Sequence, residues 1–256
     1  MNYSIIMSVY NEPLNYVRDS VESILNQTLT DFEFIIVIDN PSRFDKQIRF
    51  MEENSLDFSA TLIELIDQKG NLVYKQRESN KIYLTNDIRK MLLNRSILAH
   101  PTWCVKKKVF DKLMGYRDLV PVEDYDFAIR GALADFKIGL LNKVLLQYRL
   151  NENGISQTNK FKQYIYSAIL QDFYKEKSYI DITKITNYFQ EYVIKKRYTQ
   201  QELSKYFELK STPSITIRKL YICLYLYFKS PLVRRLLIND INILVLKLFG
   251  GEKQSD

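Results

Sequence analysis

The stretch that decides the fold covers residues 4–42 and reads SIIMSVYNEPLNYVRDSVESILNQTLTDFEFIIVIDNPS. Two short apolar runs, residues 5–9 and 34–38, lie on either side of a segment with apolar residues at helical spacing, namely Leu14, Val17, Val21, Ile24 and Leu25. This pattern predicts a strand, a helix and a second strand. A helical crossover makes the two strands parallel, and their continuous β-branched character is typical of strands buried on both faces.

Polar residues follow each predicted strand. Asn11 and Glu12 come after the first strand, and Asp39 ends the second. In an open α/β sheet, ligands bind beyond the carboxyl ends of the strands, so these side chains are expected at the mouth of a site. Asn11 and Glu12 suit the cap of the next helix equally well, with Pro13 at its first position, so capping and ligand contact both remain open.

This opening resembles the family 2 glycosyltransferases, which have the nucleotide-sugar-binding GT-A fold. The resemblance is carried by SVYNE at 8–12, SILNQT at 23–28, IVIDNPS at 36–42, HPT at 100–102, GYR at 115–117, EDYD at 123–126 and YR at 148–149. It implies an α/β GT-A domain with a Rossmann-like mixed sheet in residues 1–157. A helical C-terminal region is expected in residues 158–256.

The resemblance also implies roles for the nucleotide-sugar site. In the family, the aspartate at the position of Asp39 contacts the base of the donor, although a carboxylate there also suits the cap of a turn. Arg149 is expected either to meet the diphosphate or to be an ordinary surface arginine, and the two readings have equal weight. Nucleotide-sugar binding is therefore predicted for Asn11, Glu12, Asp39 and Arg149.

For the reaction itself, the aspartate of the family's Glu-Asp pair takes the proton from the acceptor hydroxyl, which maps onto Asp124. Glu123 is then expected to position the acceptor, and His100 and Trp103 to border the acceptor region. The structural alternative is that acids at 123–126 oppose a helix macrodipole, with a gain of about 0.3 to 1 kcal/mol each. Asp126 and Arg130 are expected to support that helix.

One departure from the family follows Ser42. Residues 43–54 look like the helix that comes after the family's metal-binding Asp-x-Asp motif, but the several dozen residues that normally precede this helix are missing. The family would use a divalent cation, Mn²⁺ or Mg²⁺, to offset the charge on the departing diphosphate. Here the sequence supplies no aspartate pair, so no metal ligand is assigned and the activity of the shortened chain stays open.

The rest of the first region is predicted from local patterns. A hairpin is expected from residues 59–66 and 72–74, a loop over 77–84 and a helix over 86–93 with Thr85 as its cap. Two further strands are predicted at 137–141 and 144–148, followed by a loop over 149–158. Gly115 is predicted to end a short helix that opens at Lys106.

The C-terminal region reads as helices at 160–177, 182–196, 200–207, 214–228 and 231–249, with caps at Asp181 and Ser230 and a capping box of Thr199 and Glu202. Charged residues interrupt the last two helices well short of a membrane span. Their basic and apolar residues suit a helix lying in the headgroup layer of an anionic membrane, or equally a face packed against a partner.

The composition narrows the class further. The chain has 256 residues, a net charge of +7 and two cysteines, Cys104 and Cys223, which are far apart and without zinc-ligand spacing. A strand that begins within four residues leaves no room for a cleavable signal, so a cytoplasmic protein, peripheral at the inner face of the membrane, is expected. No nucleic-acid-binding module is recognised.

Two functions are expected. One is an inverting transferase that moves a sugar from a nucleotide-diphosphate donor to a glycan or polyprenyl-linked acceptor in capsule or cell-wall synthesis. The other is a non-catalytic relative that acts as a partner or binding subunit. The sequence does not fix the sugar, the nucleotide, the acceptor or the oligomeric state.

Overall fold

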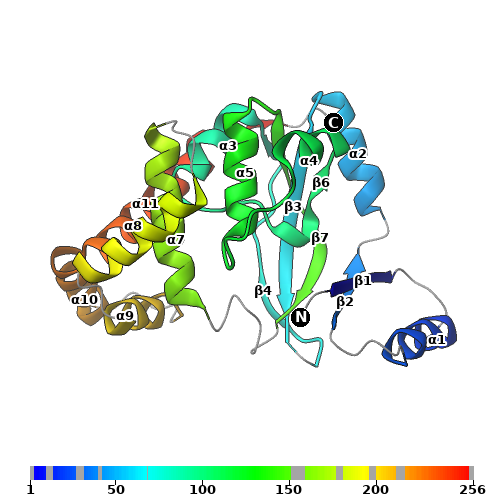
Figure 1. Ribbon diagram of the computed structural model, residues 1–256, viewed down its shortest axis with the longest axis horizontal. Coiled ribbons are helices and arrows are strands. Elements are labelled where there is room, and N and C mark those ends of the chain that lie inside the picture. Colours follow the sequence, from blue (N-terminus) through cyan, green and yellow to red (C-terminus); the bar gives the residue numbers. More distant parts are fainter. Residues whose placement is uncertain are drawn as a thin grey trace.

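The structure, a computed structural model, describes residues 3–9, 14–26, 32–39, 42–67, 69–150, 159–176, 181–195, 200–211 and 217–253. Its mixed α/β sheet and its helical C-terminal region confirm the predicted fold class (Figure 1). The predicted boundary near residue 157 falls outside the described residues.

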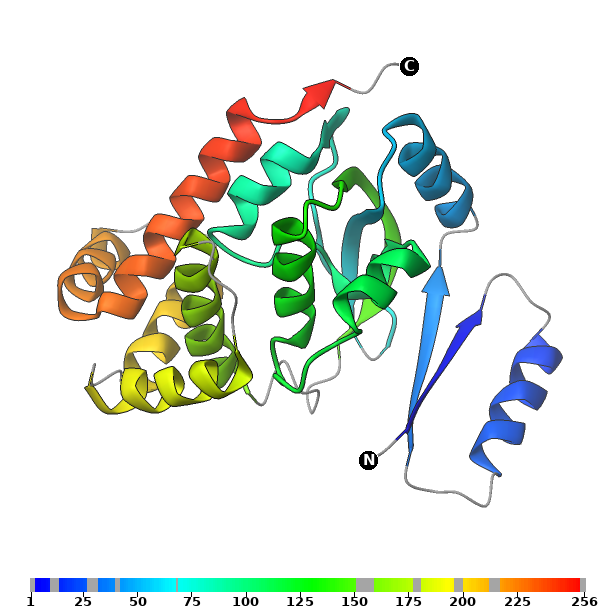
Figure 2. The ribbon, with the colours of Figure 1, turned by 45° about the horizontal axis from the view of Figure 1, so that its top comes forward.

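The opening strand–helix–strand unit has the predicted form. Strand β1 (Tyr3–Val9), helix α1 (Leu14–Leu25) and strand β2 (Phe32–Asp39) follow in order, and β1 and β2 pair in parallel from Tyr3↔Phe32 to Val9↔Ile38. In Figures 1 and 2 this unit lies at the opposite end of the molecule from the C-terminal helices.

The sheet is built around two long parallel strands, β3 (Phe58–Ile66) and β7 (Ile138–Arg149). The path of the sheet is β1-β2-β7-β3-β4, where β4 is Leu72–Lys75 and β2 meets β7 antiparallel. Two short strands pair off this path: β5 (Lys81–Tyr83) with β7, and β6 (Cys104–Val105) with β3. β3 is therefore paired along both edges, and its residues 58–62 are all buried.

Helices cover both faces of the central strands (Figure 2). Helix α2 (Arg43–Glu53) buries Phe50 and Met51 against Leu141 and Leu145 of β7 on one face. The other face is covered by α3 (Thr85–Leu92), α4 (Lys107–Leu113) and α5 (Glu123–Leu133), whose apolar residues form the main core with β3. This three-layer arrangement follows from strands that are apolar on both sides.

The C-terminal helices are α7 (Lys160–Glu176), α8 (Ile182–Lys195), α9 (Gln200–Ser211), α10 (Ile217–Lys229) and α11 (Pro231–Phe249), close to the predicted bounds. Ser230 caps α11 as predicted, because its hydroxyl accepts from the Val233 N–H at 3.4 Å. Ile165, Leu203 and Ile243 belong to the main core, so these helices pack on the sheet domain. None of the described helices is long and apolar enough to cross a membrane. Thr199 lies outside the described residues.

Three local predictions are wrong. Part of the predicted loop over 77–84 is strand β5, because Ile82 and Tyr83 are buried against β7 and β5 also pairs with the C-terminal strand β8 (Glu252–Lys253). The predicted strands at 137–141 and 144–148 form the single strand β7, whose register with β3 shifts between Thr61 and Ile63. Thr85 does not cap α3: its hydroxyl bonds instead to the backbone of Ile138, accepting from the N–H at 3.1 Å.

Candidate active site

The described structure reaches only part of the predicted nucleotide-sugar site. Asn11 and Glu12 lie outside the described residues. For Asp39 the backbone alone is described, and its Cα pairs with Leu146 in the carboxyl half of β7. Arg149 ends β7, and its guanidinium donates to the carbonyl oxygen of Asp67 in the β3–β4 turn at 2.8 Å.

The topology brings the predicted acidic pair to the same end of β7. The connection 134–137 joins the C-terminus of α5 directly to the start of β7. The N-terminus of α5, with Glu123 and Asp124, therefore lies on the side towards which β7 runs, as the labelled elements in Figure 1 show. This is the carboxyl edge of the parallel pair, where α/β sheets bind ligands.

The two acids have different surroundings. One Asp124 carboxylate oxygen accepts the Tyr125 backbone N–H at 2.6 Å, as expected of a residue in the first helical turn. Glu123 lies beside His100, and its Oε2 is buried with no hydrogen-bond partner in the described structure. Burial raises the pKa of the Asp124 carboxyl, and burial together with the charge of Asp124 raises the pKa of Glu123. Both carboxyls therefore titrate nearer to neutral pH than exposed acids do.

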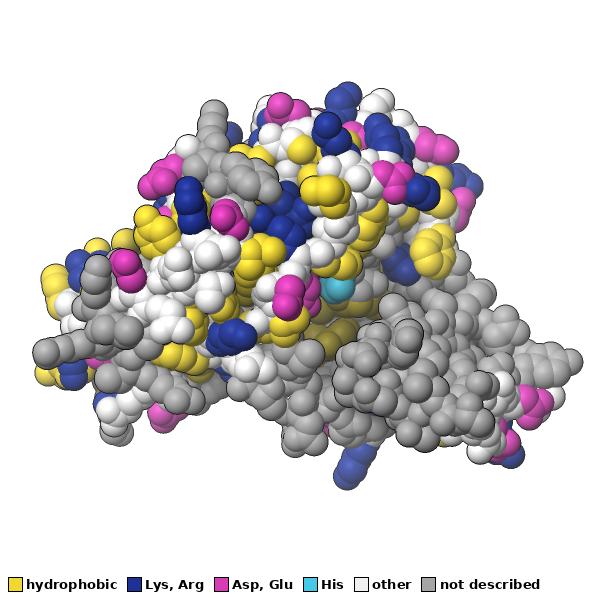
Figure 3. Space-filling model, in the orientation of Figure 1, with side chains coloured by type: hydrophobic (Ala, Val, Ile, Leu, Met, Phe, Trp, Pro, Cys, Tyr) yellow, Lys and Arg dark blue, Asp and Glu magenta, His cyan; other side chains and the backbone are white. Residues whose placement is uncertain are grey.

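His100 belongs to an aromatic cluster next to these acids. Its Nε2 lies 2.8 Å from the hydroxyl of Tyr116, and its ring meets the edge of Trp103 at 4.8 Å between centroids. Figure 3 shows the single histidine, in cyan, reaching the surface beside acidic side chains. Burial of part of the ring lowers the pKa of His100, although Glu123 acts in the opposite direction. His100 is therefore expected to be neutral at pH 7.

Tyr116 is the member of this cluster that the sequence did not single out as a site residue. Burial and the negative charges of Asp124 and Glu123 raise the pKa of its phenol to about 12. The hydroxyl consequently keeps its proton and can act as a hydrogen-bond donor towards His100 or a ligand. The sequence feature that could have identified Tyr116 as a site residue is its position in the GYR motif at 115–117.

Side chains of helix α2 hydrogen-bond to the turn that carries His100. The 3₁₀ turn η1 (His100–Thr102) presents the carbonyl oxygen of Thr102 to two side chains of α2, at 2.8 Å from Gln47 and 3.4 Å from Arg43. The Thr102 hydroxyl accepts the Thr61 N–H of β3 at 2.9 Å. These buried bonds attach the aromatic cluster firmly to the sheet.

Asp126 supports the helix rather than facing the site. It is fully buried, and its carboxylate accepts from Arg117 at 2.9 Å and from Arg130 at 2.8 Å. Arg130 also donates to the carbonyl oxygens of Leu113 and Gly115. This charged cluster ties α5 to the turn after α4, as the sequence predicted for Asp126 and Arg130, and so fixes the direction of the acidic pair.

The described residues offer no matching set of ligands for the family's divalent cation. Such an ion needs several converging oxygen ligands, usually carboxylates. Among the described residues, no group of three or more His, Cys, Asp and Glu side chains comes together. The described donor set does not fit Mn²⁺ or Mg²⁺, and no chemical step is assigned to a metal.

Comparisons with known proteins identify the relatives of this chain. The family model "Glycosyl transferase family 2" matches residues 4–49. The chain is 29% identical over 226 residues to the uncharacterized glycosyltransferase MJ1057 of Methanocaldococcus jannaschii, covering 65% of this chain and 77% of that protein. These matches confirm the predicted resemblance to the family 2 glycosyltransferases.

Two further proteins are similar to this chain. The O-antigen biosynthesis glycosyltransferase WbnJ of Escherichia coli is 26% identical over 250 residues, covering 75% of this chain and 96% of WbnJ. A crystal structure of S. aureus TarS 1-349 has a TM-score of 0.39 and 12% identity, covering 94% of this chain and 88% of that one. At that TM-score, TarS does not bear on the function.

The alignment lengths indicate that this chain lacks residues that its relatives have. Sixty-five per cent of 256 residues is about 166, so the 226-residue alignment with MJ1057 holds about 60 positions without a counterpart here. Seventy-five per cent is about 192, which leaves about 58 such positions in the alignment with WbnJ. Both figures agree in size with several dozen missing residues, and their position after Ser42 stays a prediction.

Proposed function

We propose that the protein is an inverting glycosyltransferase that moves a sugar from a nucleotide-diphosphate donor to a glycan or lipid-linked acceptor in surface-polysaccharide synthesis. The family match supports the reaction class, and the O-antigen relative supports a surface glycan as the product. Asp39 contacts the donor base, Arg149 meets the diphosphate, and His100 and Trp103 border the acceptor in this proposal.

In the proposed reaction, Asp124 accepts the proton of the acceptor hydroxyl as that oxygen forms a bond to the anomeric carbon. The bond between this carbon and the diphosphate oxygen breaks on the opposite face, and the diphosphate leaves with the electron pair. This single displacement inverts the anomeric centre.

One observation carries the proposal: a partly buried carboxyl, Asp124, stands at the N-terminus of α5 at the carboxyl edge of the sheet. A general base works best when its pKa lies near the working pH, and burial moves the pKa of Asp124 in that direction. Glu123 next to it, whose Oε2 has no hydrogen-bond partner among the described residues, is available to contact the acceptor and so position it.

The set of possible metal ligands among the described residues favours a second candidate function. Without converging metal ligands among the described residues, the chain is also suited to act as a non-catalytic binding subunit that keeps the fold. The two candidates differ in one measurable property, because the transferase turns over a nucleotide sugar and the binding subunit does not.

The test is donor turnover by the purified full chain. UDP-, GDP- and dTDP-sugars are incubated with Mn²⁺, with Mg²⁺ and with a chelator, and release of the nucleoside diphosphate is measured. Turnover of at least one donor in any of these conditions supports the transferase. Its absence with every donor and in every condition contradicts the transferase and leaves the binding subunit.

We further propose that α10 and α11 contact an anionic membrane from the cytoplasmic side. Exposed apolar side chains recur at helical spacing on α10, namely Ile217, Leu220, Tyr221, Leu224 and Phe228. Basic side chains lie beside them, among them Lys229, which sits over the Tyr225 ring at 5.2 Å. This combination suits the headgroup layer of an acidic bilayer, which a positively charged chain approaches favourably.

Sedimentation with vesicles tests this contact. The wild type is expected to sediment with phosphatidylglycerol-containing vesicles and not with phosphatidylcholine vesicles. Phe228→Ser is expected to weaken binding, whereas Tyr188→Ser, which removes an exposed aromatic ring from α8, is the matched control. Equal loss in both variants, or no sedimentation of the wild type, contradicts the proposal.

A further inference from the structure

Two short turns bring His100 and Tyr116 together, and each turn is held by buried contacts. His100 opens η1, and the Thr102 hydroxyl of this turn donates to the Ala99 carbonyl oxygen at 2.8 Å. The same hydroxyl accepts the Thr61 N–H of β3 at 2.9 Å. The backbone that carries His100 is therefore attached both to the sheet and to its own turn.

Tyr116 lies in the turn that follows α4. Gly115 before it has a φ of +70°, a left-handed conformation that glycine adopts without strain, and its carbonyl oxygen accepts from Arg130 at 2.8 Å. Arg117 after it donates to the buried carboxylate of Asp126 at 2.9 Å. Both neighbours of Tyr116 are thus bound to side chains of α5.

The Tyr116 ring packs against two other aromatic rings. It meets the ring of Phe110 at 5.6 Å and that of the buried Phe127 at 5.1 Å between centroids. These contacts involve the ring alone, and the hydroxyl lies 2.8 Å from Nε2 of His100. The geometry of the pair is therefore set by packing before any ligand arrives, which lowers the cost of binding.

The chemistry of the two groups favours Tyr116 as the donor. Burial and the charges of Asp124 and Glu123 keep the proton on the phenol, because they raise its pKa to about 12. A neutral imidazole has one unprotonated nitrogen, which accepts a hydrogen bond more strongly than a phenol oxygen does. Among the described residues, the Tyr116 hydroxyl bonds to no other acceptor, the two acids included.

We propose that Tyr116 is a positioning residue whose hydroxyl donates to Nε2 of His100 and so holds the ring proton on Nδ1. The tautomer of a neutral histidine is set by the hydrogen bond that its other nitrogen makes. Burial keeps His100 neutral at pH 7, because it lowers the pKa of the ring. The two nitrogens then have separate tasks: Nε2 anchors the ring, and Nδ1–H is left to donate.

This tautomer gives the aromatic cluster an available hydrogen-bond donor. Trp103 Nε1 already donates to the Leu98 carbonyl oxygen at 3.3 Å, and the Tyr116 hydrogen is used by His100. Nδ1 of His100 bonds to nothing in the part of the chain that the structure describes, and the ring reaches the surface beside acidic side chains (Figure 3). The use of this donor by a sugar acceptor rests on the proposed function, whereas the tautomer itself does not.

The experiment records the protonation of each ring nitrogen by NMR. The chain has a single histidine, so ¹⁵N-histidine labelling of the full chain gives one imidazole to assign. Long-range ¹H–¹⁵N spectra at about pH 8, where the ring is neutral, distinguish a protonated from an unprotonated nitrogen. Tyr116→Phe removes the hydroxyl and keeps the ring contacts, and Tyr188→Phe, at an exposed tyrosine of α8, is the matched control.

The wild type and Tyr188→Phe are expected to show an unprotonated Nε2 and a protonated Nδ1. In Tyr116→Phe, the Nε2 signal is expected to shift towards the range of protonated nitrogens. A protonated Nε2 in the wild type, or a spectrum that Tyr116→Phe leaves unchanged, overturns the proposal. So does Glu123→Gln if it alone moves the Nε2 signal, because the acid and not the phenol would then set the tautomer.

These spectra require no turnover, so the two proposals can fail separately. The expected spectra in a chain that turns over no donor contradict the proposed transferase and support the role of Tyr116. Donor turnover by a chain whose His100 carries its proton on Nε2 supports the transferase and overturns the role of Tyr116.

Discussion

Replacing Asp126 with alanine is expected to lower the free energy of unfolding by about 3 to 5 kcal/mol, because it leaves buried positive charge without its partner. The Asp126 side chain is 0% exposed, and its partners Arg117 and Arg130 are 14% and 13% exposed. Two guanidinium groups thus lose the carboxylate of Asp126.

The chain offers a matched control in Asp45→Ala. Asp45 and Arg49 form an ion pair four residues apart on a helix, as Asp126 and Arg130 do, at a comparable distance of 3.0 Å. Their side chains, however, are 59% and 70% exposed. An exposed helical pair of this kind contributes about 0.3 to 0.5 kcal/mol, so this variant is expected to change stability little.

Urea unfolding followed by circular dichroism measures both variants against the wild type. The urea midpoint is expected to fall clearly for Asp126→Ala and to change little for Asp45→Ala. Equal shifts would show that burial does not determine the strength of these pairs, and would refute the role given to Asp126 in fixing α5.

Three further outcomes are expected. Gly139→Ala should lower the free energy of unfolding by about 1 to 3 kcal/mol, because its Cβ would lie 2.4 Å from a Leu56 methyl carbon. In α5, the Cβ of Gly131→Ala would have ordinary contacts at 3.7 Å or more, so this variant should raise the free energy of unfolding by about 0.5 to 1 kcal/mol. Thermal unfolding distinguishes the two variants. Thr85→Val should cost about 1 to 3 kcal/mol in urea unfolding, since it leaves the buried Ile138 N–H unpaired, and an unchanged midpoint would contradict this. Turnover should fall with decreasing pH as Asp124 gains its proton, and its raised pKa places this limb above the usual aspartate value of about 3.9; a pH–rate profile without such a limb contradicts a base at this position.

The raised pKa of Asp124 also has a consequence for stability. The folded state binds the proton more tightly than the unfolded state, so the stabilisation is fully present below the unfolded pKa and is lost as the pH rises through the folded pKa. Burial of this carboxyl therefore costs stability at neutral pH. Such a cost is common at functional sites, where groups are held away from their most stable environment.

Local sequence patterns predicted the elements well where periodicity was strong. The parallel unit β1–α1–β2, the β3–β4 hairpin and the five C-terminal helices all appear near their predicted bounds. The hairpin turn depends on Asp67, whose carboxylate accepts the N–H groups of Lys69 and Asn71 at 2.8 Å. These features arise from contacts between residues near one another in the sequence, which periodicity and turn chemistry report directly.

Features that depend on distant partners were missed. Ile82 and Tyr83 form a strand because β7 and the C-terminal β8 offer backbone partners, which a three-residue pattern does not indicate. Thr85 has the composition of a cap but bonds to Ile138, 53 residues away. Tertiary hydrogen bonds here outweigh local propensity.

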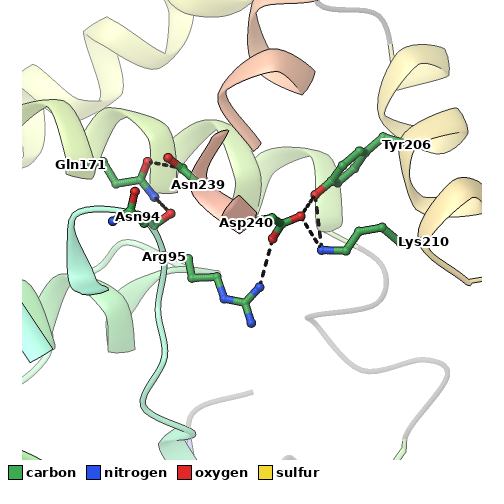
Figure 4. A network of polar contacts seen from close by, with 7 residues as sticks. All are labelled: Asn94, Arg95, Gln171, Tyr206, Lys210, Asn239 and Asp240. Carbon is green, nitrogen blue, oxygen red and sulfur yellow. Dashed lines mark hydrogen bonds and ion pairs between the residues drawn. The ribbon is translucent and has the colours of Figure 1, made fainter. Parts of the chain in front are cut away.

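The same difference between local and distant contacts explains which parts of the candidate site could be predicted from the sequence. Glu123 and Asp124 stood out because they belong to a contiguous motif, and the bonds between Asp126 and Arg130 follow from helical spacing. The contacts of Gln171 with Asn94 and of Tyr206 with Asp240 could not be predicted, because these residues come together only in the folded chain (Figure 4).

The measurement that bears most directly on the central claim is the turnover of Asp124→Asn against that of Asp118→Asn, an identical change at an exposed residue six positions earlier. Both are assayed with the nucleotide sugar that the wild type turns over best. Loss of a general base predicts a fall in kcat of about 10²- to 10⁴-fold for Asp124→Asn and little change for Asp118→Asn. Equal turnover by the two variants would contradict a catalytic Asp124.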